Sequence, residues 1–493
     1  MGRKVPIFYN ALMLTGVNLL LRMVGTSFQV YLSSRIGAAG IGLLQLVLSV
    51  GAMAMTAGIA GIRTATMYLT AEELGKRRPG NVVWVLSGAF LYSLLCSGTV
   101  ALLLYSLAPR IAGGWINDIR TTDAIRLLAA FLPITCLSGV MTGYFTAANR
   151  IGTLAAVEVA EQACSMICTV IALTLWADSD PARACQAVVF GSGAGAILTL
   201  FCLSILRCRE KSLRSPRIPI ARRLTAVAIP LALADDLKAG ISTAENLMVP
   251  KRLALFRGTE NPLALFGTVC GMVFPVLMFP AAILFGLTEL LIPEMARCNA
   301  AGSQKRIHYL MHRSLRIALL YGTLCGGILL LAAPELCLSL YGSTQAGVYL
   351  RWFAPLAVML YCDIVTDAMI KGLGQQKASV RYNIFTSALD VLFLYILLPR
   401  YGIAGYFASF LLTHVVNFIL SLRRLMCITK QTISIRTTVC VIITAVISAG
   451  IASMAQLPLV RCFAYTLLLI FGLVLSGILG RNDIRWMKGL LRK

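Results

Sequence analysis

The sequence predicts an all-α membrane protein with about fourteen transmembrane helices, and three observations lead to this prediction. Hydrophobic residues make up 58% of the 493 residues and charged residues only 13%, whereas a soluble globular chain carries roughly 25% charged residues. The mean hydropathy is +0.82, and apolar runs of membrane-spanning length recur along the whole chain. Finally, the basic residues are concentrated in every second segment between these runs, as the positive-inside rule requires.

The apolar runs are separated by polar, basic or proline-bearing segments, which mark helix ends. They lie at 7–32, 38–62, 81–107, 124–147, 151–176, 184–206, 224–249, 263–292, 315–333, 349–370, 379–398, 403–422, 434–454 and 458–480. The first run contains Arg22, and the seventh contains Asp235, Asp236, Lys238 and Glu245. Because a charged group in the hydrocarbon core is costly, these side chains are expected inside a bundle or along a wet cavity.

Charge predicts the orientation of these runs. If all fourteen cross and both termini are cytoplasmic, the inner segments hold 31 Lys and Arg residues and the outer segments hold 11. This imbalance fits the positive-inside rule, and one missed span would remove it. The basic inner loops also explain most of the net charge of +24 and are expected to meet anionic lipids. Binding to nucleic acid is not expected, since no soluble module is present to carry it.

Cysteine and histidine patterns predict neither disulfides nor metal. Most of the fifteen cysteines lie inside apolar runs, and no C-x-x-C pair occurs, so they are expected to act as small hydrophobes. His308 and His312 have metal-binding spacing, but no third ligand or metalloprotease glutamate accompanies them. Their segment is predicted to be an amphipathic helix at the cytoplasmic interface. No Walker motif is present, so neither a cofactor nor direct ATP hydrolysis is expected.

An internal repeat predicts the domain organisation. Phe131-Leu-Pro133 begins one helix and Phe353-Ala-Pro355 begins another, 222 residues later. In both halves a short turn and another span follow. An even number of spans separates the two, which predicts a parallel repeat of two six-helix lobes, with a substrate site between them. We expect an N-lobe at 1–207, a basic cytoplasmic linker at 208–223, a C-lobe at 224–424, and two further helices with a basic tail at 425–493.

Several segments resemble a known family. They are Leu21-Arg22-Met-Val-Gly25, Arg35-Ile-Gly-Ala-Ala-Gly40-Ile-Gly42, Gly58-Ile-Ala-Gly61, Val249-Pro-Lys-Arg252, Gly271-Met-Val-Phe-Pro275, Leu291-Ile-Pro293 and Leu398-Pro399-Arg-Tyr-Gly402. Their order and spacing are similar to those of polysaccharide flippases in the MATE-like MOP superfamily. Within it the sequence resembles the stage V sporulation protein B group, which is related to lipid II flippases. Those flippases carry further arginines where this sequence has Phe28 and Pro275.

The resemblance implies a function and a location. It implies a monomeric, non-enzymatic flippase of a bacterial cytoplasmic membrane, working by alternating access and driven by H⁺, Na⁺ or the membrane potential. The implied substrate is an undecaprenyl-linked saccharide, such as a peptidoglycan precursor for the spore cortex. A cation-coupled multidrug exporter of the MATE type is the main alternative. A membrane glycosyltransferase is less well supported because the outer loops are short, and a sporulation scaffold without transport activity stays open.

Two sets of charged residues are candidates for the transport path. The guanidinium of Arg22 suits a pyrophosphate, although a structural ion pair would also explain it. Substrate binding is predicted for Arg22, Arg35, Lys238, Lys251 and Arg252. Ion coupling is predicted for Asp235, Asp236, Glu245, Asp363 and Asp390. Asp235 and Lys238, at i and i+3, are expected to pair. The alternatives are that the charges on the seventh run simply face water and that Lys251 and Arg252 belong to a solvated loop.

Overall fold

The computed structural model describes residues 7–76, 78, 80–176, 180–209, 220–258, 260–432 and 435–478, which are almost entirely helical and contain no strand. By its internal contacts the chain divides into two compact units. The first comprises Met1–Gly271 with Leu394–Gly402, and the second comprises Met272–Phe393 with Ile403–Lys493. Most of the predicted basic linker and the whole predicted basic tail lie outside the described residues.

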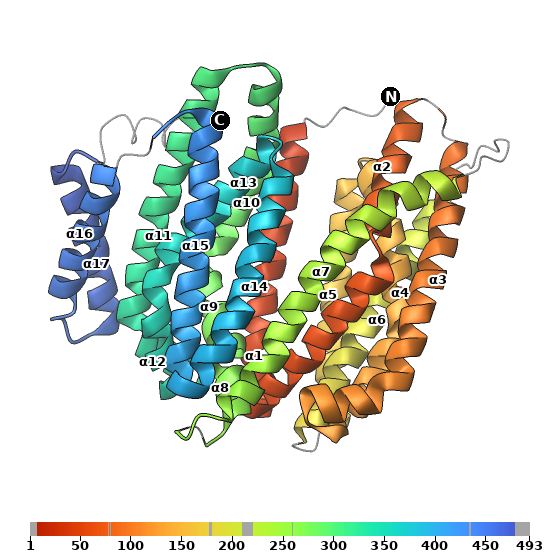
Figure 1. Cartoon of the computed structure of the whole chain (residues 1–493), viewed down its shortest axis with the longest axis horizontal. Coiled ribbons are helices and arrows are strands. Elements are labelled where there is room, and N and C mark those ends of the chain that lie inside the picture. Colours follow the sequence, from red (N-terminus) through yellow and green to blue (C-terminus); the bar gives the residue numbers. More distant parts are fainter. Residues whose placement is uncertain are drawn as a thin grey trace. The chain divides into compact units, whose positions relative to one another are not determined.

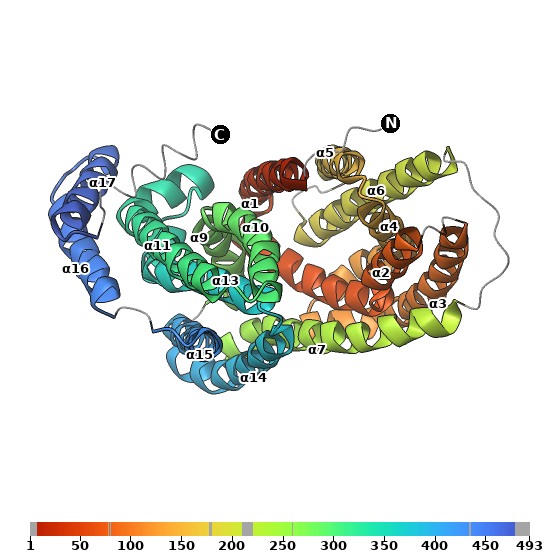
Figure 2. The same cartoon turned by 90° about the horizontal axis from the view of Figure 1, so that it is seen from above.

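The first unit consists mainly of eight α-helices (Figure 1). They are α1 (Ile7–Ile59), α2 (Ile62–Gly75), α3 (Asn81–Arg110), α4 (Thr122–Ala147), α5 (Ile151–Trp176), α6 (Pro181–Cys208), α7 (Ala221–Leu253) and α8 (Pro262–Thr268). Two short segments, η1 (Ile111–Ile116) and η2 (Ile119–Thr121), connect α3 to α4. Seen from above, α4 is surrounded by α2, α3 and α6 (Figure 2).

The first two predicted runs both lie on α1. Gly37 interrupts this helix with φ 69° and ψ 177°, a conformation that a residue without Cβ adopts at little cost. Figure 1 shows that the two halves of α1 run in opposite directions on either side of this break. Each half is therefore a separate candidate span, as the sequence predicts.

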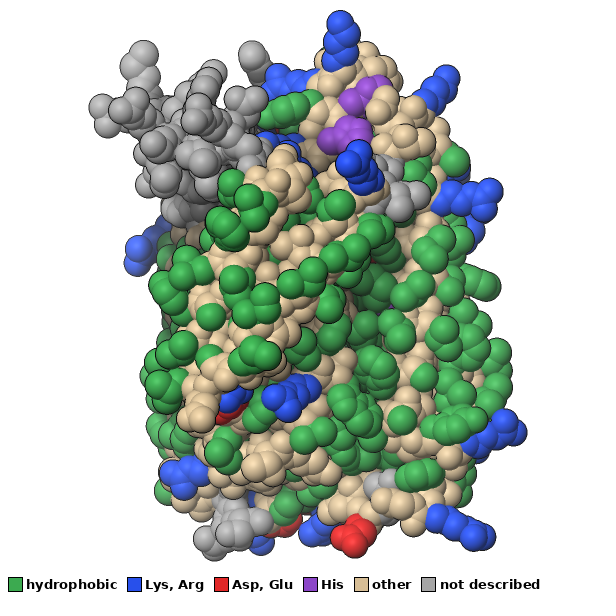
Figure 3. Space-filling model, turned by 90° about the vertical axis from the view of Figure 1, so that its left-hand side faces the viewer, with side chains coloured by type: hydrophobic (Ala, Val, Ile, Leu, Met, Phe, Trp, Pro, Cys, Tyr) green, Lys and Arg blue, Asp and Glu red, His purple; other side chains and the backbone are tan. Residues whose placement is uncertain are grey.

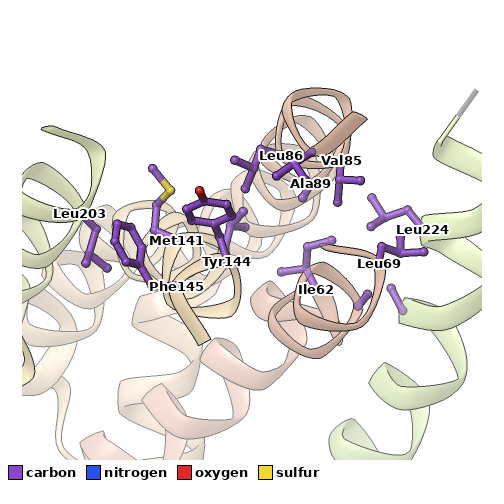
Figure 4. Packing of buried hydrophobic residues seen from close by; sticks show 14 of the residues in the cluster. Ile62, Leu69, Val85, Leu86, Ala89, Met141, Tyr144, Phe145, Leu203 and Leu224 are labelled. Carbon is purple, nitrogen blue, oxygen red and sulfur yellow. The ribbon is translucent and has the colours of Figure 1, made fainter. Parts of the chain in front are cut away.

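A core of aliphatic and aromatic side chains holds the helices of the first unit together (Figure 4). Ile62 on α2, Phe145 on α4 and Leu203 on α6 are fully buried in it. Leu86 on α3 and Leu224 on α7 close the same cluster. Its contacts bring the first turn of α7 against α2 and α3, and this fixes where the polar part of α7 lies within the unit.

The second unit continues from the π-helical segment η3 (Val269–Val273). Its helices are α9 (Phe274–Met278), α10 (Ala281–Ala300), α11 (Gln304–Tyr341), α12 (Thr344–Phe353), η4 (Ala354–Leu356), α13 (Ala357–Gly372), α14 (Gln376–Tyr401), α15 (Ile403–Thr429), α16 (Ile435–Ala452) and α17 (Pro458–Leu475). The last turns of α14, from Leu394 onward, group with the first unit.

Tyrosines stabilise a bend at the start of this unit. The helical segments Pro262–Met278 and Ala281–Ala300 meet at an angle of 59°. The hydroxyl of Tyr361 donates to the Leu277 carbonyl at 2.8 Å, and that of Tyr321 donates to the Pro280 carbonyl at 2.8 Å. These bonds satisfy carbonyls at the break inside a membrane, where the Pro280 carbonyl also accepts from the Ile283 N–H at 3.3 Å.

In the part of the chain that the structure describes, each of the fourteen predicted runs lies mostly on helical structure. Among the described residues, ten helices are long and apolar enough to cross a membrane, and the bent pair raises this to eleven. One of the ten is the segment Leu19–Leu74, which contains most of α1 and α2, whereas α16 is shorter and α7 is not among the ten. The chain is therefore a multi-pass helical membrane protein, while the number fourteen stays a prediction. On the face in Figure 3, hydrophobic side chains cover the middle and most Lys and Arg side chains lie toward the ends.

The two halves of the predicted repeat share local geometry. The helix that contains Pro133 ends just before Asn149, which has φ 58°, and α5 follows. The helix that begins after Pro355 ends just before Gly374, which has φ 77°, and α14 follows. In both halves, a residue with a left-handed backbone conformation thus joins two helices at an equivalent place.

Candidate functional site

Asp390 is a buried carboxylate in the second unit, with 7% of its surface exposed. It lies on α14 and accepts hydrogen bonds from two hydroxyls of α15. Ser409 Oγ donates to its Oδ1 at 2.6 Å, and Thr413 Oγ1 donates to the same atom at 3.2 Å. The two donors are four residues apart, so they lie one turn apart on one face of α15.

Asp363 on α13 contacts the same face of α15, one turn further along that helix. Its Oδ2 accepts a hydrogen bond from Asn417 Nδ2 at 2.9 Å. Its Oδ1 is buried and accepts none from the described residues. Thr386 on α14 donates to Asn417 Oδ1 at 3.4 Å. Asp363 and Asp390, two of the predicted ion-coupling residues, therefore contact consecutive turns of one polar face of α15.

Only neutral groups donate to these two carboxylates. Among the described residues, neither Asp363 nor Asp390 forms an ion pair with Lys, Arg or His within 4.0 Å. Asp367, one turn after Asp363, differs because Lys371 pairs with it and the Ser379 hydroxyl donates to it. A buried carboxylate without a cationic partner favours taking up a proton or a small cation. Oxygen atoms of Asp, Asn, Ser and Thr are ligands that hard cations prefer.

The predicted residues on α7 lie in the first unit and are less enclosed. Asp235 and Lys238 are exposed, and neither forms an ion pair with a described residue. The predicted pair between them is therefore wrong. Asp236 is half-buried, near Tyr92 of α3, and its Oδ1 has no hydrogen-bond partner among the described residues. Glu245 is also half-buried.

Ser49 connects the middle of α7 to the second half of α1. Thr243 Oγ1 donates to the Ser49 carbonyl at 3.0 Å, and Asn246 Nδ2 donates to the Ser49 hydroxyl at 3.0 Å. These bonds lie on either side of Glu245 in the sequence. They hold the polar part of α7 against α1 within the first unit, even though the residues around Asp235 stay exposed.

The two candidate arginines of α1 lie apart from one another. Arg22 and Arg35 are both exposed on the first half of the helix. The Arg35 guanidinium lies 5.8 Å from the centre of the Tyr31 ring, within the range of a cation–π contact. Thirteen residues of helix separate the arginines, about 20 Å at 1.5 Å per residue. A single pyrophosphate therefore does not span both.

Lys251 and Arg252, by contrast, line one groove of 600 Å³ in the first unit. Other lining residues are Met53, Trp115, Gly240, Thr243, Ala244, Leu247, Met248, Leu255 and Tyr395. The Lys251 ammonium donates to the Gly114 carbonyl. The Arg252 guanidinium stacks on the Tyr395 ring, 3.3 Å from its centre. The structure thus brings together two of the five predicted substrate-binding residues, beside aromatic rings.

The turn after η1 fixes the wall that carries Trp115. Asp118 accepts a hydrogen bond from the backbone N–H of Arg120 at 3.0 Å, and its carboxylate pairs with the Arg120 guanidinium at 2.8 Å. These bonds, with the Arg120 side chain contributing most, hold the pKa of Asp118 below its usual value. Arg120 also reaches Asp180 at 3.5 Å. The carboxylate is thus ionised at neutral pH and keeps the turn in place.

A larger apolar cavity of 1060 Å³ lies in the second unit, between α11 and the helices α16 and α17. Leu319, Leu330, Val446 and Tyr465 are among its lining residues. Three basic residues also line it, His312, Arg316 and Arg436. The cavity thus has the chemistry of an amphiphile's binding site, with an apolar wall and cationic groups in its lining.

His312 and its neighbour His308 have structural partners. His308 Nε2 donates to the Thr429 carbonyl at 2.8 Å, and His312 Nε2 donates to Gln431 Oε1 at 3.4 Å. Both histidines lie in the first turns of α11, which continues without a break to Tyr341. The segment is therefore helical, as predicted, and continues directly into the helix that carries the ninth predicted run; its position at the cytoplasmic interface stays a prediction. No group of three or more His, Cys, Asp or Glu residues in the described part of the chain is placed to bind a metal.

Two features of the polar sites were not predicted. The buried polar residues of α15 recur every four positions, at Ser409, Thr413, Asn417 and Ser421, and this period is visible in the sequence as a polar stripe on an apolar helix. The second feature is the partner of Glu161 on α5, which accepts a hydrogen bond from Thr199 Oγ1 on α6 at 2.7 Å. The sequence offers no local signal that pairs these two helices there.

Comparison with known proteins confirms the resemblance. Residues 260–396 match the MatE family model. The chain is 23% identical over 421 residues to stage V sporulation protein B of Bacillus subtilis (strain 168), covering 82% of this chain and 80% of the relative. This homology extends well beyond the MatE match, into both units.

Solved structures show the same fold. The chain is similar to the lipid II flippase MurJ in an inward closed conformation, with a TM-score of 0.69, 11% identity and coverage of 96% of this chain and 99% of that one. It is also similar to an inward-facing multidrug resistance MATE family transporter of the MOP superfamily, with a TM-score of 0.63, 16% identity and coverage of 85% and 100%. These relatives are transporters, and together the comparisons support a flippase-type transporter with the MATE-like fold.

Proposed function

We propose that this flippase-type transporter, a homologue of stage V sporulation protein B, moves an undecaprenyl-linked saccharide across a bacterial cytoplasmic membrane by alternating access. The observation that carries the proposal is the 1060 Å³ cavity beside α16 and α17. A lipid-linked saccharide phosphate combines a long apolar chain with an anionic head. An apolar cavity whose lining includes His312, Arg316 and Arg436 matches both parts.

The head group needs further cationic partners along its path. We assign this role to Arg22, Arg35 and Lys238, which are exposed in the first unit. Their spacing favours successive contacts with the head group over one shared site, because Arg22 and Arg35 are about 20 Å apart along α1. Arg22 is the strongest member, since a guanidinium binds phosphate oxygens through two parallel hydrogen bonds. Lys251 and Arg252 stand apart, because they line a groove of their own.

Ion coupling is assigned to the polar face of α15 and the two carboxylates that contact it. Asp363 and Asp390 would take up and release H⁺ or Na⁺ as the transporter changes conformation, since no cationic side chain in the described part of the chain forms an ion pair with either. Asp236, with its buried and unpartnered Oδ1, is a second place for a proton in the first unit. Asp235 is too exposed to favour a coupling ion strongly, and Glu245 is half-buried.

The cellular setting follows from charge and homology. We propose that both termini are cytoplasmic, that the basic inner loops contact anionic lipids, and that the chain acts as a monomer. Because the homologue is named as a sporulation protein, spore cortex synthesis is the favoured process, with a peptidoglycan precursor as the favoured cargo.

One observation favours a second function. Uncompensated carboxylates such as Asp363 also suit a cationic drug, and a multidrug resistance MATE transporter shares the fold. A cation-coupled multidrug exporter is therefore the alternative. Expression of the chain in a drug-sensitive strain separates the two functions, since only the exporter raises resistance to cationic dyes.

Filling the cavity tests the lipid-linked cargo. Ala445→Trp places an indole in the cavity lining on α16, whereas Ile447→Trp places one on an exposed position of the same helix outside the lining. In a strain depleted of its flippase, we expect the first variant to lose at least about 10-fold in complementation and the second to retain it. Arg22→Ala is expected to lose function at normal expression, while Arg110→Ala, an exposed arginine at the end of α3, retains it. Full complementation by Ala445→Trp would refute the proposed role of the cavity.

A further inference from the structure

The groove beside Lys251 and Arg252 follows one face of α7. Gly240, Thr243, Ala244, Leu247 and Lys251 line it, at the spacing of three and four residues that places side chains on one side of a helix. The opposite wall comes from Met53 on α1 and Trp115 on η1. Apart from Thr243, α7 contributes only apolar groups to the lining before Lys251. The groove is therefore mainly apolar along its length and basic at one end.

The length of the groove matches one leaflet of a bilayer. From Gly240 to Lys251 the helix rises about 16 Å at 1.5 Å per residue. The hydrocarbon core of a membrane is about 30 Å thick, so a single leaflet contributes about half of that. An acyl chain of a membrane lipid fits this length, whereas a polyprenyl chain several times longer does not.

The basic end of the groove keeps its positive charge. Among the described residues, neither Lys251 nor Arg252 forms an ion pair with a carboxylate within 4.0 Å. Lys251 donates instead to the Gly114 carbonyl, and Arg252 stacks on Tyr395. These neutral contacts orient the two cations without neutralising them. Two adjacent, oriented cations at the end of an apolar groove are complementary to a phosphate that carries a hydrocarbon chain.

We propose that this groove is a binding site for an anionic glycerophospholipid of the membrane, separate from the transported cargo. The phosphate lies against Lys251 and Arg252, and one acyl chain lies along α7 between Gly240 and Leu247. The bound lipid contacts α1, η1 and α7 together. Because a ligand stabilises the conformation that it binds, the lipid favours the arrangement of these three elements that the structure shows.

Lipid quenching of Trp115 tests the proposal. The full chain is reconstituted in vesicles of phosphatidylcholine that contain increasing fractions of dibrominated phosphatidylglycerol or, separately, dibrominated phosphatidylcholine. The Trp115 signal is obtained by subtracting that of Trp115→Phe, since the chain has five tryptophans. We expect the bromolipid with the anionic head to reach half-maximal quenching at a mole fraction about 10-fold lower than the neutral one, as two cations near a membrane surface predict.

Two variants locate the lipid. In the double variant Lys251→Gln with Arg252→Gln, both bromolipids are expected to quench Trp115 equally. Arg257→Gln changes an exposed arginine outside the groove lining and is expected to keep the preference for the anionic bromolipid. Gly240→Leu places a side chain in the open space of the groove away from the two cations, because a Cβ there meets nothing within 4 Å. This variant is expected to weaken the preference at least about 3-fold. Gly98→Leu is its control, with the same open surroundings on α3.

Several outcomes would overturn the proposal. Equal quenching by the two lipids in the unmodified chain would show that the groove does not select an anionic head. An unchanged preference in Gly240→Leu would show that no acyl chain lies along α7. Displacement of phosphatidylglycerol by traces of undecaprenyl phosphate would assign the groove to the cargo, and displacement by inorganic phosphate alone would assign it to a soluble anion.

Discussion

Two clusters of carboxylates, one in each unit, differ in what compensates their charge. In the first unit Arg223 at the start of α7 donates to Glu73 and Glu72 of α2, both at 2.9 Å. Asn81 donates to Glu73 at 2.8 Å, and Lys76 pairs with Glu72. In the second unit Asp363 and Asp390 receive only amide and hydroxyl donors. One cluster is a set of ion pairs, and the other is a set of acids among neutral groups.

The difference separates a structural role from a transport role. Glu73 is buried, but a cation and an amide saturate it, so a further ion would have to displace Arg223. Asp363 has a buried oxygen that no described residue contacts. An incoming proton or cation therefore displaces nothing there and relieves the cost of burying a charge. Burial alone does not mark a coupling site; burial without a cationic partner does.

The largest expected effect follows from removing the charge at the uncompensated cluster. Asp363→Asn keeps the shape and the contact with Asn417 but removes the anion. We expect complementation of the flippase-depleted strain to fall at least about 100-fold, because a buried ionisable group in a transporter is usually on the ion pathway. Normal membrane expression, measured by immunoblotting, distinguishes loss of coupling from loss of folding.

Asp123→Asn is the control for Asp363→Asn. Asp123 begins α4, is 72% exposed and makes only a 3.9 Å contact with Arg126. Its replacement is expected to leave complementation unchanged. If Asp363→Asn complemented as well as this control, the distinction between compensated and uncompensated carboxylates would not predict function in this protein.

The sequence predicts the helical membrane fold well, because the physics that sets it is local. Apolar runs of membrane-spanning length and their basic flanks are properties of consecutive residues. The break at Gly37 also falls between two predicted runs. The sequence does less well where a helix is polar: α7 is 33 residues long but does not pass as a span by composition.

Partners across helices explain most of what the sequence did not predict at the sites. Asp363 and Asp390 were predicted, but Asn417 and Ser409 were not, since the pairing of α13 and α14 with α15 depends on packing of segments far apart in the chain. The predicted pair of Asp235 and Lys238 failed for the opposite reason. The i, i+3 spacing permits a contact, but exposed side chains gain little from making it.

A moderate effect on stability is expected from breaking the compensated cluster. Arg223→Met keeps much of the side-chain volume and leaves the buried Glu73 with Asn81 as its one donor among the described residues. We expect a loss of about 2–3 kcal/mol in the free energy of unfolding, measured by equilibrium unfolding in mixed micelles. Glu72→Gln removes the more exposed acid and is expected to cost less than about 1 kcal/mol. Equal losses would show that burial does not set the strength of this cluster.

The smallest effect is expected from removing one neutral donor of the uncompensated cluster. Ser409→Ala takes away the 2.6 Å hydrogen bond to Asp390 and leaves the weaker one from Thr413 at 3.2 Å. We expect a loss of about 1–2 kcal/mol in the free energy of unfolding. Ser421→Ala is the control, because Ser421 is equally buried on the same face of α15 but makes no recorded contact with a carboxylate. Equal losses in the two variants would show that the hydrogen bond from Ser409 to Asp390 does not contribute to stability.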